Sequence, residues 1–425
     1  MSWTHPVIMP AGLVVFVFVT HLFGLTTSYD SRWSIPTARS LLYERNTDLN
    51  EYRSLLEKNQ FFAIEVFDGR FYGTFPIGAS LLAVPVVGVV DALGLKLGDG
   101  KIEKVTASLA IALTTMLLFL IARRSLDVRE ALLIVLIFAF CTAAWSTASR
   151  ALWQHGPSML MLTLALWLIV VAQERPWVVQ FASLPLAFSY VVRPTNVVSI
   201  VFLSALVLLR HRQFFLRYTL WGLAVLVPFA AYSAAVYHWP VPPYYSVRRV
   251  GHVSTFFEAL AGNLVSPARG LFVHSPVLLL CVYGAWRRLR ERTEWLDWTL
   301  VAIVASHWVV ISSFPHWWGG HSFGYRFFSD MLPFMVYFLV PVIARIPALP
   351  LNRRRVFLWV LGGLTGVSLF INYRGANDFD VYLWNRQPVD VDLHPERLWD
   401  WNDPQFLRGL VRPQHGRRPR LDQRS

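Results

Sequence analysis

Long apolar runs dominate the chain, and short polar stretches separate them. A helix needs about 20 apolar residues to cross a bilayer. Runs near that length lie at 7–25, 105–122, 131–146, 156–172, 177–191, 195–209, 216–236, 274–286, 295–313, 331–344 and 356–371. The pattern predicts an all-α polytopic membrane protein with about eleven transmembrane helices.

One further apolar run, 76–94, decides the predicted topology. It contains Pro76, Gly78, Pro85 and Asp91, which favour a helix that lies in the interface or re-enters the membrane rather than spanning it. Four arginine clusters, within 123–129, 210–217, 287–292 and 345–355, then fall on one side. Short cytosolic loops carry such an excess of basic residues.

This placement predicts an internal N-terminus, an external C-terminus and an active site on the outer side of a membrane, which we expect to be a bacterial cytoplasmic membrane. The first run lacks a basic segment before it and a small-residue cleavage site after it. We therefore expect it to be retained rather than removed as a signal peptide.

Composition supports a membrane protein and excludes other classes. Hydrophobic residues make up 55% of the 425 residues and charged residues only 15%, against roughly 25% charged in soluble domains. Two cysteines cannot form a disulfide framework. The net charge of +13 is explained by the arginine clusters between spans, so no nucleic-acid partner is expected.

Two long segments lie outside the predicted spans. Residues 26–104 form a large first external loop that contains interfacial helices, within a transmembrane catalytic domain of residues 1–371. Residues 372–425 form an external tail with several Trp and Asp residues, which either stacks on sugars or caps the external cavity. Its last dozen residues are rich in Arg and Gln, and we expect them to be disordered.

Acidic residues of the first loop are candidates for acid–base chemistry. Asp30 directly follows the first span, where a carboxylate is costly without a partner or a task. It is either ion-paired with Arg32 or Arg39, or it is a general base for an acceptor hydroxyl. Glu65, between apolar residues, is a weaker second candidate. Asp68 is weaker still, because Asp68-Gly69 reads as the turn between two short extended segments.

Three arginines stand at the predicted outer boundary of the membrane. They are Arg150, Arg193 and Arg326. All three are candidates for binding a donor phosphate, since guanidinium groups hold phosphate through paired hydrogen bonds. His155, in the same loop as Arg150, is a further candidate for this role. Each arginine taken singly also fits a salt bridge or a lipid-headgroup anchor.

The segment 314–326 combines aromatic, histidine and glycine residues. His316, Trp318, His321 and Tyr325 are candidates for contacts with the acceptor or the sugar. His155, His316 and His321 lack a recognised metal-ligand spacing, so interfacial anchoring competes with binding of a divalent metal by a histidine and a carboxylate. The predicted cytosolic loops contain no nucleotide-binding motif.

These features together resemble the polytopic glycosyltransferases of the GT-C fold, which include the protein O-mannosyltransferases and the lipid A aminoarabinose transferases. The resemblance covers roughly residues 1–345. It rests on Asp30 after the first span and on four segments, 72–82, 149–153, 192–195 and 318–326.

The resemblance implies a function for this chain. It implies a polyprenyl-phosphate sugar as donor, an acceptor arriving from the outer side, and a single inverting displacement with Asp30 as base. Ser31 follows Asp30, where the mannosyltransferases have an adjacent Asp-Glu pair. The sugar, an arabinofuranose or a hexose, and the acceptor, a protein, glycolipid or glycan, stay open.

Two other functions compete with this interpretation. One is a lipid-carrier polysaccharide polymerase or ligase with a diphosphate-linked donor. The other is a transporter or flippase, which would place ionisable residues near the bilayer midplane.

Overall fold

A computed structural model describes residues 8–59, 61–246, 254–291 and 294–410. Within these ranges the chain is helical apart from one two-stranded sheet. Residue 7 of the first predicted span, Arg292 of an arginine cluster and the last dozen residues of the tail lie outside the described residues. So do Arg248 and Arg249, in a loop that the charge pattern predicts to be external.

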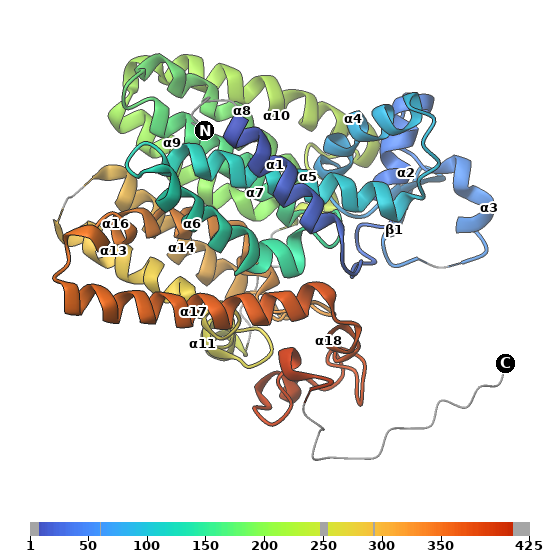
Figure 1. Cartoon of the computed structure of the whole chain (residues 1–425). Helices are drawn as coiled ribbons and strands as arrows, with labels where there is room; N and C mark the ends of the chain where they lie inside the picture. The colour runs from blue at the N-terminus through green and yellow to red at the C-terminus, as the bar shows by residue number, and fades with distance from the viewer. Residues whose placement is uncertain (1–7, 60, 247–253, 292–293, 411–425) are drawn as a thin grey trace.

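Every predicted span coincides with helix, as Figure 1 shows. The helices are α1 (Ile8–Leu22), α5 (Asp99–Ala122), α6 (Val128–Phe140), α7 (His155–Val171), α8 (Ser183–Val192), α9 (Val197–Arg210), α10 (Phe215–Tyr237), α13 (Leu279–Glu291), α14 (Trp295–Ser312), α15 (Leu332–Tyr337) with α16 (Leu339–Ile343), and α17 (Leu351–Asn377). The all-α membrane architecture is confirmed.

The helices differ in how far they reach. By length and apolar content, α5, Arg212–Tyr237, α14 and α17 are long enough to cross a membrane, and the bent pair Arg326–Tyr337 and Leu339–Ala348 makes a fifth crossing if it counts as one span. The bend of 40° lies next to Pro341, which cannot donate a hydrogen bond to the carbonyl of Tyr337 four residues earlier.

Helix α5 lies at the centre of one half of the bundle and contacts α1, α4 (Gly78–Ala92), α6 and α7. Its buried face is built from small and apolar side chains such as Ala107, Ile111 and Ala112. The hydroxyl groups of Thr114 and Thr115 donate to carbonyls four residues earlier, each at 2.8 Å. These bonds satisfy buried polar groups inside the helix itself.

The first loop forms a small layer on the bundle. It contains α2 (Ser34–Arg39), η1 (Ser40–Glu44), η2 (Asn50–Tyr52), α3 (Arg53–Leu56), β1 (Ile64–Phe67) and β2 (Arg70–Gly73), followed by α4. Asp68 and Gly69 have φ values of 50° and 71°, which a two-residue hairpin turn requires. The predicted turn is confirmed. Helix α4 packs on α2 and also contacts α5, α7 and α8, and the interfacial or re-entrant placement of the run 76–94 stays a prediction.

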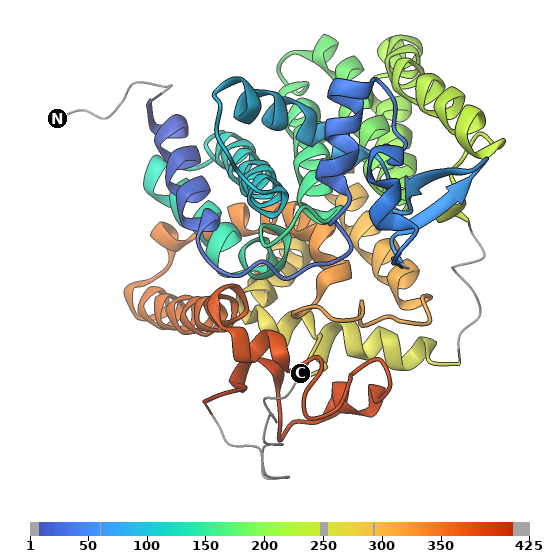
Figure 2. The same cartoon turned by 90° about the vertical axis from the view of Figure 1, so that its right-hand side faces the viewer.

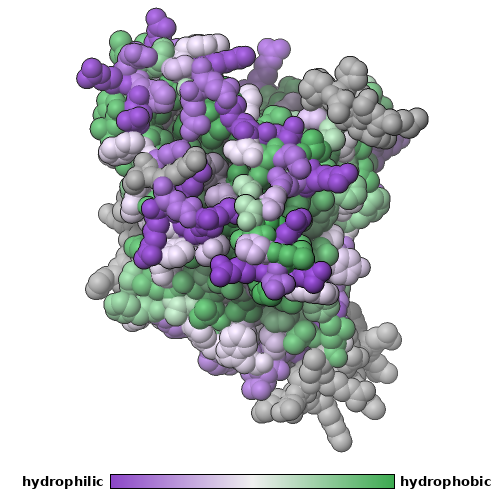
Figure 3. Space-filling view, turned by 60° about the vertical axis from the view of Figure 1, so that its left-hand side comes forward, coloured by the Kyte–Doolittle hydropathy of each residue, from purple (hydrophilic) through white to green (hydrophobic). Residues whose placement is uncertain are grey.

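The two ends of the bundle differ in character. The α9–α10 and α16–α17 turns and the C-terminal end of α13, which carry residues of three arginine clusters, lie at the left in Figure 1, and hydrophilic side chains gather on that face in Figure 3. The first loop and the tail lie at the opposite end, which faces the viewer in Figure 2. This arrangement matches the separation that the charge pattern predicts.

The tail packs against the bundle. Helix α17 continues six residues past the predicted domain boundary at 371, to Asn377, and α18 (Phe379–Leu383), η12 (Pro395–Trp399) and η13 (Gln405–Leu407) follow. Trp384 and Leu398 are fully buried and share a cluster with Trp317 and Trp318 of the segment before η10 (Arg326–Met331). The described tail is therefore held in place by apolar contacts.

Candidate active site

Asp30 lies in the turn between α1 and α2, at the loop end of the bundle. Its backbone N–H donates to the Ser28 hydroxyl oxygen at 3.1 Å. Its carboxylate accepts from Nη2 of Arg326 at 2.5 Å. Of the partners expected from the sequence, Arg39 instead pairs with Asp91 at 2.7 Å, and Arg32 lies over the ring of Phe61. The ion pair of Asp30 thus joins the first loop to a residue almost 300 positions away.

A buried charged network lies behind this pair. Asp330 in η10 is fully buried and forms an ion pair with Nη1 of Arg193 at 3.0 Å. Nδ1 of His155 lies 3.2 Å from the other oxygen of Asp330, and Nε2 accepts from Nε of Arg326, also at 3.2 Å. Nη1 of Arg193 contacts the same imidazole ring. Burial lowers the pKa of Arg193, and the charge of Asp330 opposes that shift. Asp330 therefore compensates the charge of Arg193.

Arg326 links Asp30 to the buried network of Asp330, Arg193 and His155. Its guanidinium carbon lies 3.8 Å from the ring centroid of Trp153, within the range of a cation–π interaction. Besides contacting Asp30 and His155, it donates from Nη1 to the carbonyl of Gly319 at 3.2 Å. Asp30, Arg326 and the buried network are therefore one connected polar site.

A cavity of about 510 Å³ opens onto this site. Asp30, His155, Arg193 and Arg326 line its polar part. The remaining wall is mostly apolar and aromatic, from Phe75, Pro76, Ala79, Leu152, Trp153, Tyr190, Val197, Tyr244, Tyr245, Val310, Phe314 and Phe327. A second, much smaller cavity of about 30 Å³ shares Asp30, Ser34, Phe75 and Pro76 with it, so Asp30 lines both cavities. A polar end on an apolar pocket suits a ligand with a charged head and a hydrocarbon body.

Arg150 lies apart from the cavity. It is fully buried and donates to the carbonyls of Phe23 at 2.7 Å, Ala376 at 3.3 Å and His21. Burial lowers its pKa to about 9. These contacts tie α1 and α17 to the loop before α7, so its donors face backbone carbonyls, whereas those of Arg193 and Arg326 reach the cavity.

We expect Arg150→Met to destabilise the fold and to leave the affinity for a lipid-phosphate sugar donor unchanged. The methionine side chain fills most of the volume of the arginine, but it leaves the three buried carbonyls without a hydrogen-bond partner. This loss costs roughly 3 kcal/mol of folding free energy. The unfolding midpoint of the purified protein and a donor-binding titration on the folded fraction measure the two effects. Weaker donor binding at an unchanged midpoint would return Arg150 to the phosphate site.

The other acidic candidates of the first loop lie away from the cavity lining. Asp68 is exposed at the hairpin turn, where it pairs with His238 at 2.9 Å. Glu65 lies in β1, opposite Tyr72 of β2. Neither is among the residues that line the two cavities.

The four candidates of the segment 314–326 have different surroundings. His316 is exposed and its ring lies 4.9 Å from that of Trp318, whose indole N–H donates to Asp392 at 2.7 Å. Tyr325 is buried, and its hydroxyl accepts from the Ala143 backbone N–H at 3.0 Å. His321 faces Asp390 and Asp392 of the tail. None of the four is among the residues that line the two cavities.

Sequence reasoning missed two charged residues of this region. Asp330 is the acid immediately before the predicted span 331–344, and an acid at that depth was its only signal. Arg269 is fully buried between α11 (Phe256–Val265) and α12 (Leu271–His274), where burial lowers its pKa to about 9. It donates to the carbonyls of Trp318 and Gly320 and to Asn385 of the tail, at 2.8–3.0 Å.

Comparison with known proteins reveals similarity in structure. No family model and no curated protein sequence matches the chain. ArnT from Cupriavidus metallidurans bound to undecaprenyl phosphate is 13% identical, with a TM-score of 0.53 over 89% of this chain and 68% of ArnT. The oligosaccharyltransferase of Archaeoglobus fulgidus is 10% identical, with a TM-score of 0.55 over 95% of this chain and 61% of that protein.

A further structure of the archaeal oligosaccharyltransferase AglB contains an inhibitory peptide and a dolichol-phosphate. It has a TM-score of 0.52 at 10% identity and covers 94% of this chain. This chain spans 60% of that protein's length. ArnT and AglB are glycosyltransferases of the GT-C fold. At these identities the likeness shows the fold, and this chain has the GT-C fold that its sequence resembles.

Proposed function

We propose that the chain is an inverting glycosyltransferase that moves a sugar from a polyprenyl-phosphate donor to an acceptor hydroxyl at the outer face of the membrane. The observation that carries this proposal is the contact between the Asp30 carboxylate and the Arg326 guanidinium on the wall of an otherwise mostly apolar cavity. The fold likeness to proteins whose structures contain undecaprenyl phosphate or dolichol-phosphate supports it.

The charged residues of the site have separate roles. Asp330 compensates Arg193, which leaves Arg326 as the cation able to exchange its partner. Among the described residues that line the large cavity, Asp30 is the sole carboxylate. A donor phosphate that binds Arg326 competes with Asp30 for the same guanidinium, so donor binding frees Asp30 to accept a proton.

The reaction then proceeds as one displacement. Asp30 takes the proton of the acceptor hydroxyl, and the hydroxyl oxygen attacks the anomeric carbon. The bond from that carbon to the phosphate oxygen breaks with inversion, and polyprenyl phosphate leaves with one more negative charge. Negative charge thus moves from Asp30 to the phosphate, and the total charge of the site is unchanged. Arg326 can contact both groups, so it can stabilise the charge at either position.

A transfer assay on purified protein tests this function. Polyprenyl-phosphate sugars with arabinofuranose and hexose headgroups are supplied with membrane glycolipid or peptide acceptors, and release of free polyprenyl phosphate is measured. Release from one donor identifies the reaction and its sugar. Release only from a diphosphate-linked donor would favour a polymerase or ligase, and no release with folded protein would favour transport.

Arg326→Ala is expected to weaken donor binding by about 10- to 100-fold, the loss expected for a hydrogen bond to a charged phosphate. The acceptor KM should change much less, because Arg326 is assigned to the phosphate. A titration with the lipid-linked donor and a steady-state acceptor series measure the two effects.

Arg32→Ala is the matched control for this variant. Arg32 is an exposed arginine two positions after Asp30 that lies over the Phe61 ring. Its removal should leave donor affinity unchanged. If Arg326→Ala raises the acceptor KM and leaves donor affinity intact, Arg326 belongs to the acceptor site instead.

A further inference from the structure

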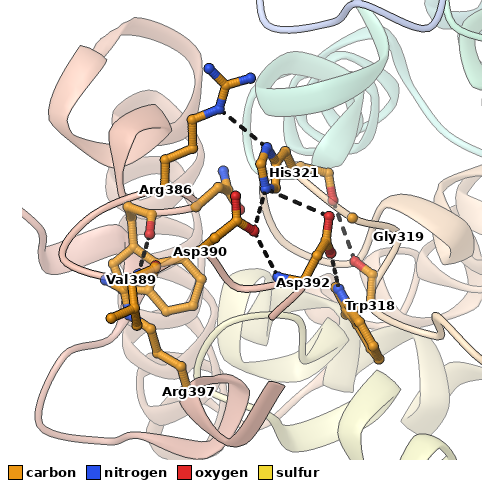
Figure 4. A network of polar contacts seen from close by, with 12 residues as sticks. Trp318, Gly319, His321, Arg386, Val389, Asp390, Asp392 and Arg397 are labelled. Carbon is orange, nitrogen blue, oxygen red and sulfur yellow. Dashed lines mark hydrogen bonds and ion pairs between the residues drawn. The ribbon is translucent and has the colours of Figure 1, made fainter. Parts of the chain in front are cut away.

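Three potential metal ligands meet where the tail covers the segment before η10. Nε2 of His321 lies 2.8 Å from Oδ1 of Asp390 and 3.5 Å from Oδ2 of Asp392. One ligand atom from each of the three side chains lies within 4.8 Å of the others. In Figure 4 the imidazole and the two carboxylates point toward one another from two separate segments. We call these residues the His321 triad.

The triad has two carboxylates but only one imidazole N–H to share between them. The imidazole N–H at Nε2 donates to one carboxylate, whereas two carboxylates converge on it. Like charges at this separation repel each other unless a cation lies between them. A divalent cation at the centre would take the place of the Nε2 proton and bind both carboxylates at once.

Neighbouring groups hold the two carboxylates in this orientation. The indole N–H of Trp318 donates to Oδ1 of Asp392 at 2.7 Å, which leaves Oδ2 toward His321. The backbone N–H of Asp392 donates to Oδ1 of Asp390 at 2.9 Å. Outer hydrogen bonds of this kind orient the ligands of protein metal sites. The triad side chains are 24–38% exposed, so an aqueous ion can reach them.

We propose that the His321 triad binds a zinc ion, or a divalent first-row transition metal of similar preference. An imidazole with two carboxylates is a nitrogen–oxygen ligand set that zinc accepts, with water as fourth ligand. Calcium and magnesium prefer oxygen ligands alone. Metal–ligand bonds of about 2.0–2.2 Å require only small side-chain movements from the distances observed.

The proposed site connects the tail to the residue at the centre of the polar network. His321 follows Gly319 and Gly320, and the Gly319 carbonyl accepts from Arg326. Asp390 and Asp392 belong to the tail that Trp384 anchors in the apolar cluster. A metal here would hold the tail against the segment that positions Arg326, at a place separate from the cavity lining.

A substitution at Arg386 is expected to raise the zinc affinity, whereas substitution of a ligand should lower it. Its Nε donates to Nδ1 of His321 at 3.4 Å, and the side chain is exposed. When Nε2 binds a metal, the imidazole proton moves to Nδ1, and Arg386 must turn away. Arg386→Ala removes both this competition and a nearby positive charge, so it should bind zinc severalfold more tightly.

The test uses the full chain without a polyhistidine tag, stripped with a chelator and titrated with zinc. Bound metal per chain is counted after desalting, and the unfolding midpoint is followed with zinc concentration. We expect one tightly bound zinc per chain and a rise of the midpoint. His321→Gln, which keeps a donor toward Asp390 and is a poor zinc ligand, should lose at least 100-fold in affinity and show no rise.

His316→Ala is the matched control, because His316 lies in the same segment and is exposed. It should bind zinc as the unchanged chain does. Trp318→Phe keeps all three ligands, loses the bond to Asp392, and should fall about 10- to 100-fold in affinity. Equal zinc binding by His321→Gln and the unchanged chain, no zinc bound by either, or preference for calcium or magnesium would overturn the proposal.

Discussion

Asp30→Asn is expected to reduce transfer by about 10²- to 10⁴-fold, the range that a positioned general base contributes. The amide keeps the size and shape of the carboxylate, but it replaces one acceptor oxygen by an NH2 group and cannot take the acceptor proton. Single-turnover rates with saturating donor measure the loss directly, because they exclude product release.

Donor binding should change in the opposite direction. Asp30 and the donor phosphate compete for Arg326, which Asp30 contacts at 2.5 Å. A neutral asparagine competes less, so the donor should bind Asp30→Asn several times more tightly. Asp68→Asn is the control, because Asp68 is an exposed carboxylate of the same loop that pairs with His238. Transfer by Asp30→Asn within tenfold of the unchanged chain would remove Asp30 from its role.

Much of the site follows from the order of apolar and polar residues. Asp30, His155, Arg193 and Arg326 all stand in loops close to the end of an apolar run, and the alternation of runs places these loops at one end. The structure brings all four together on one cavity. The hairpin turn at Asp68-Gly69 was equally predictable, because its chemistry is local.

Position along the chain gives depth in the membrane but not direction. Arg150 has the same kind of position as Arg193, yet it turns inward to the carbonyls of α1 and α17. Its three acceptors come from segments that lie more than 100 residues away in sequence. A single sequence carries no signal for that choice.

Long-range pairing also explains why Asp330 was missed, and why His321 was named as a possible metal ligand without its partners Asp390 and Asp392. The partners of Asp330 are 137 and 175 residues earlier, and Asp390 is 69 residues after His321. The Trp- and Asp-rich composition of the tail suggested sugar stacking or a cap. The described part folds against Trp317 and Trp318, with Trp384 and Trp399 of the tail in the same apolar cluster, because a tryptophan side chain buries a large apolar surface. Both interpretations stay predictions.

Asp330→Asn is expected to be the most destabilising substitution in the site. Asp330 is fully buried, and its loss of charge leaves Arg193, only 5% exposed, without a compensating anion. Removing one partner of such a buried pair costs about 3–5 kcal/mol. The free energy of unfolding in detergent or bicelles measures this cost.

A double-mutant cycle separates this pair from general damage to the core. Arg193→Gln alone should also destabilise, because it leaves Asp330 as an unpaired buried anion. The double variant Asp330→Asn/Arg193→Gln removes both charges, so its loss should be smaller than the sum of the two single losses. Additive losses would mean that the two charges do not stabilise each other. In that case Arg193 would be free to bind a donor phosphate together with Arg326, and the assignment of Arg326 as the exchanging cation would fail.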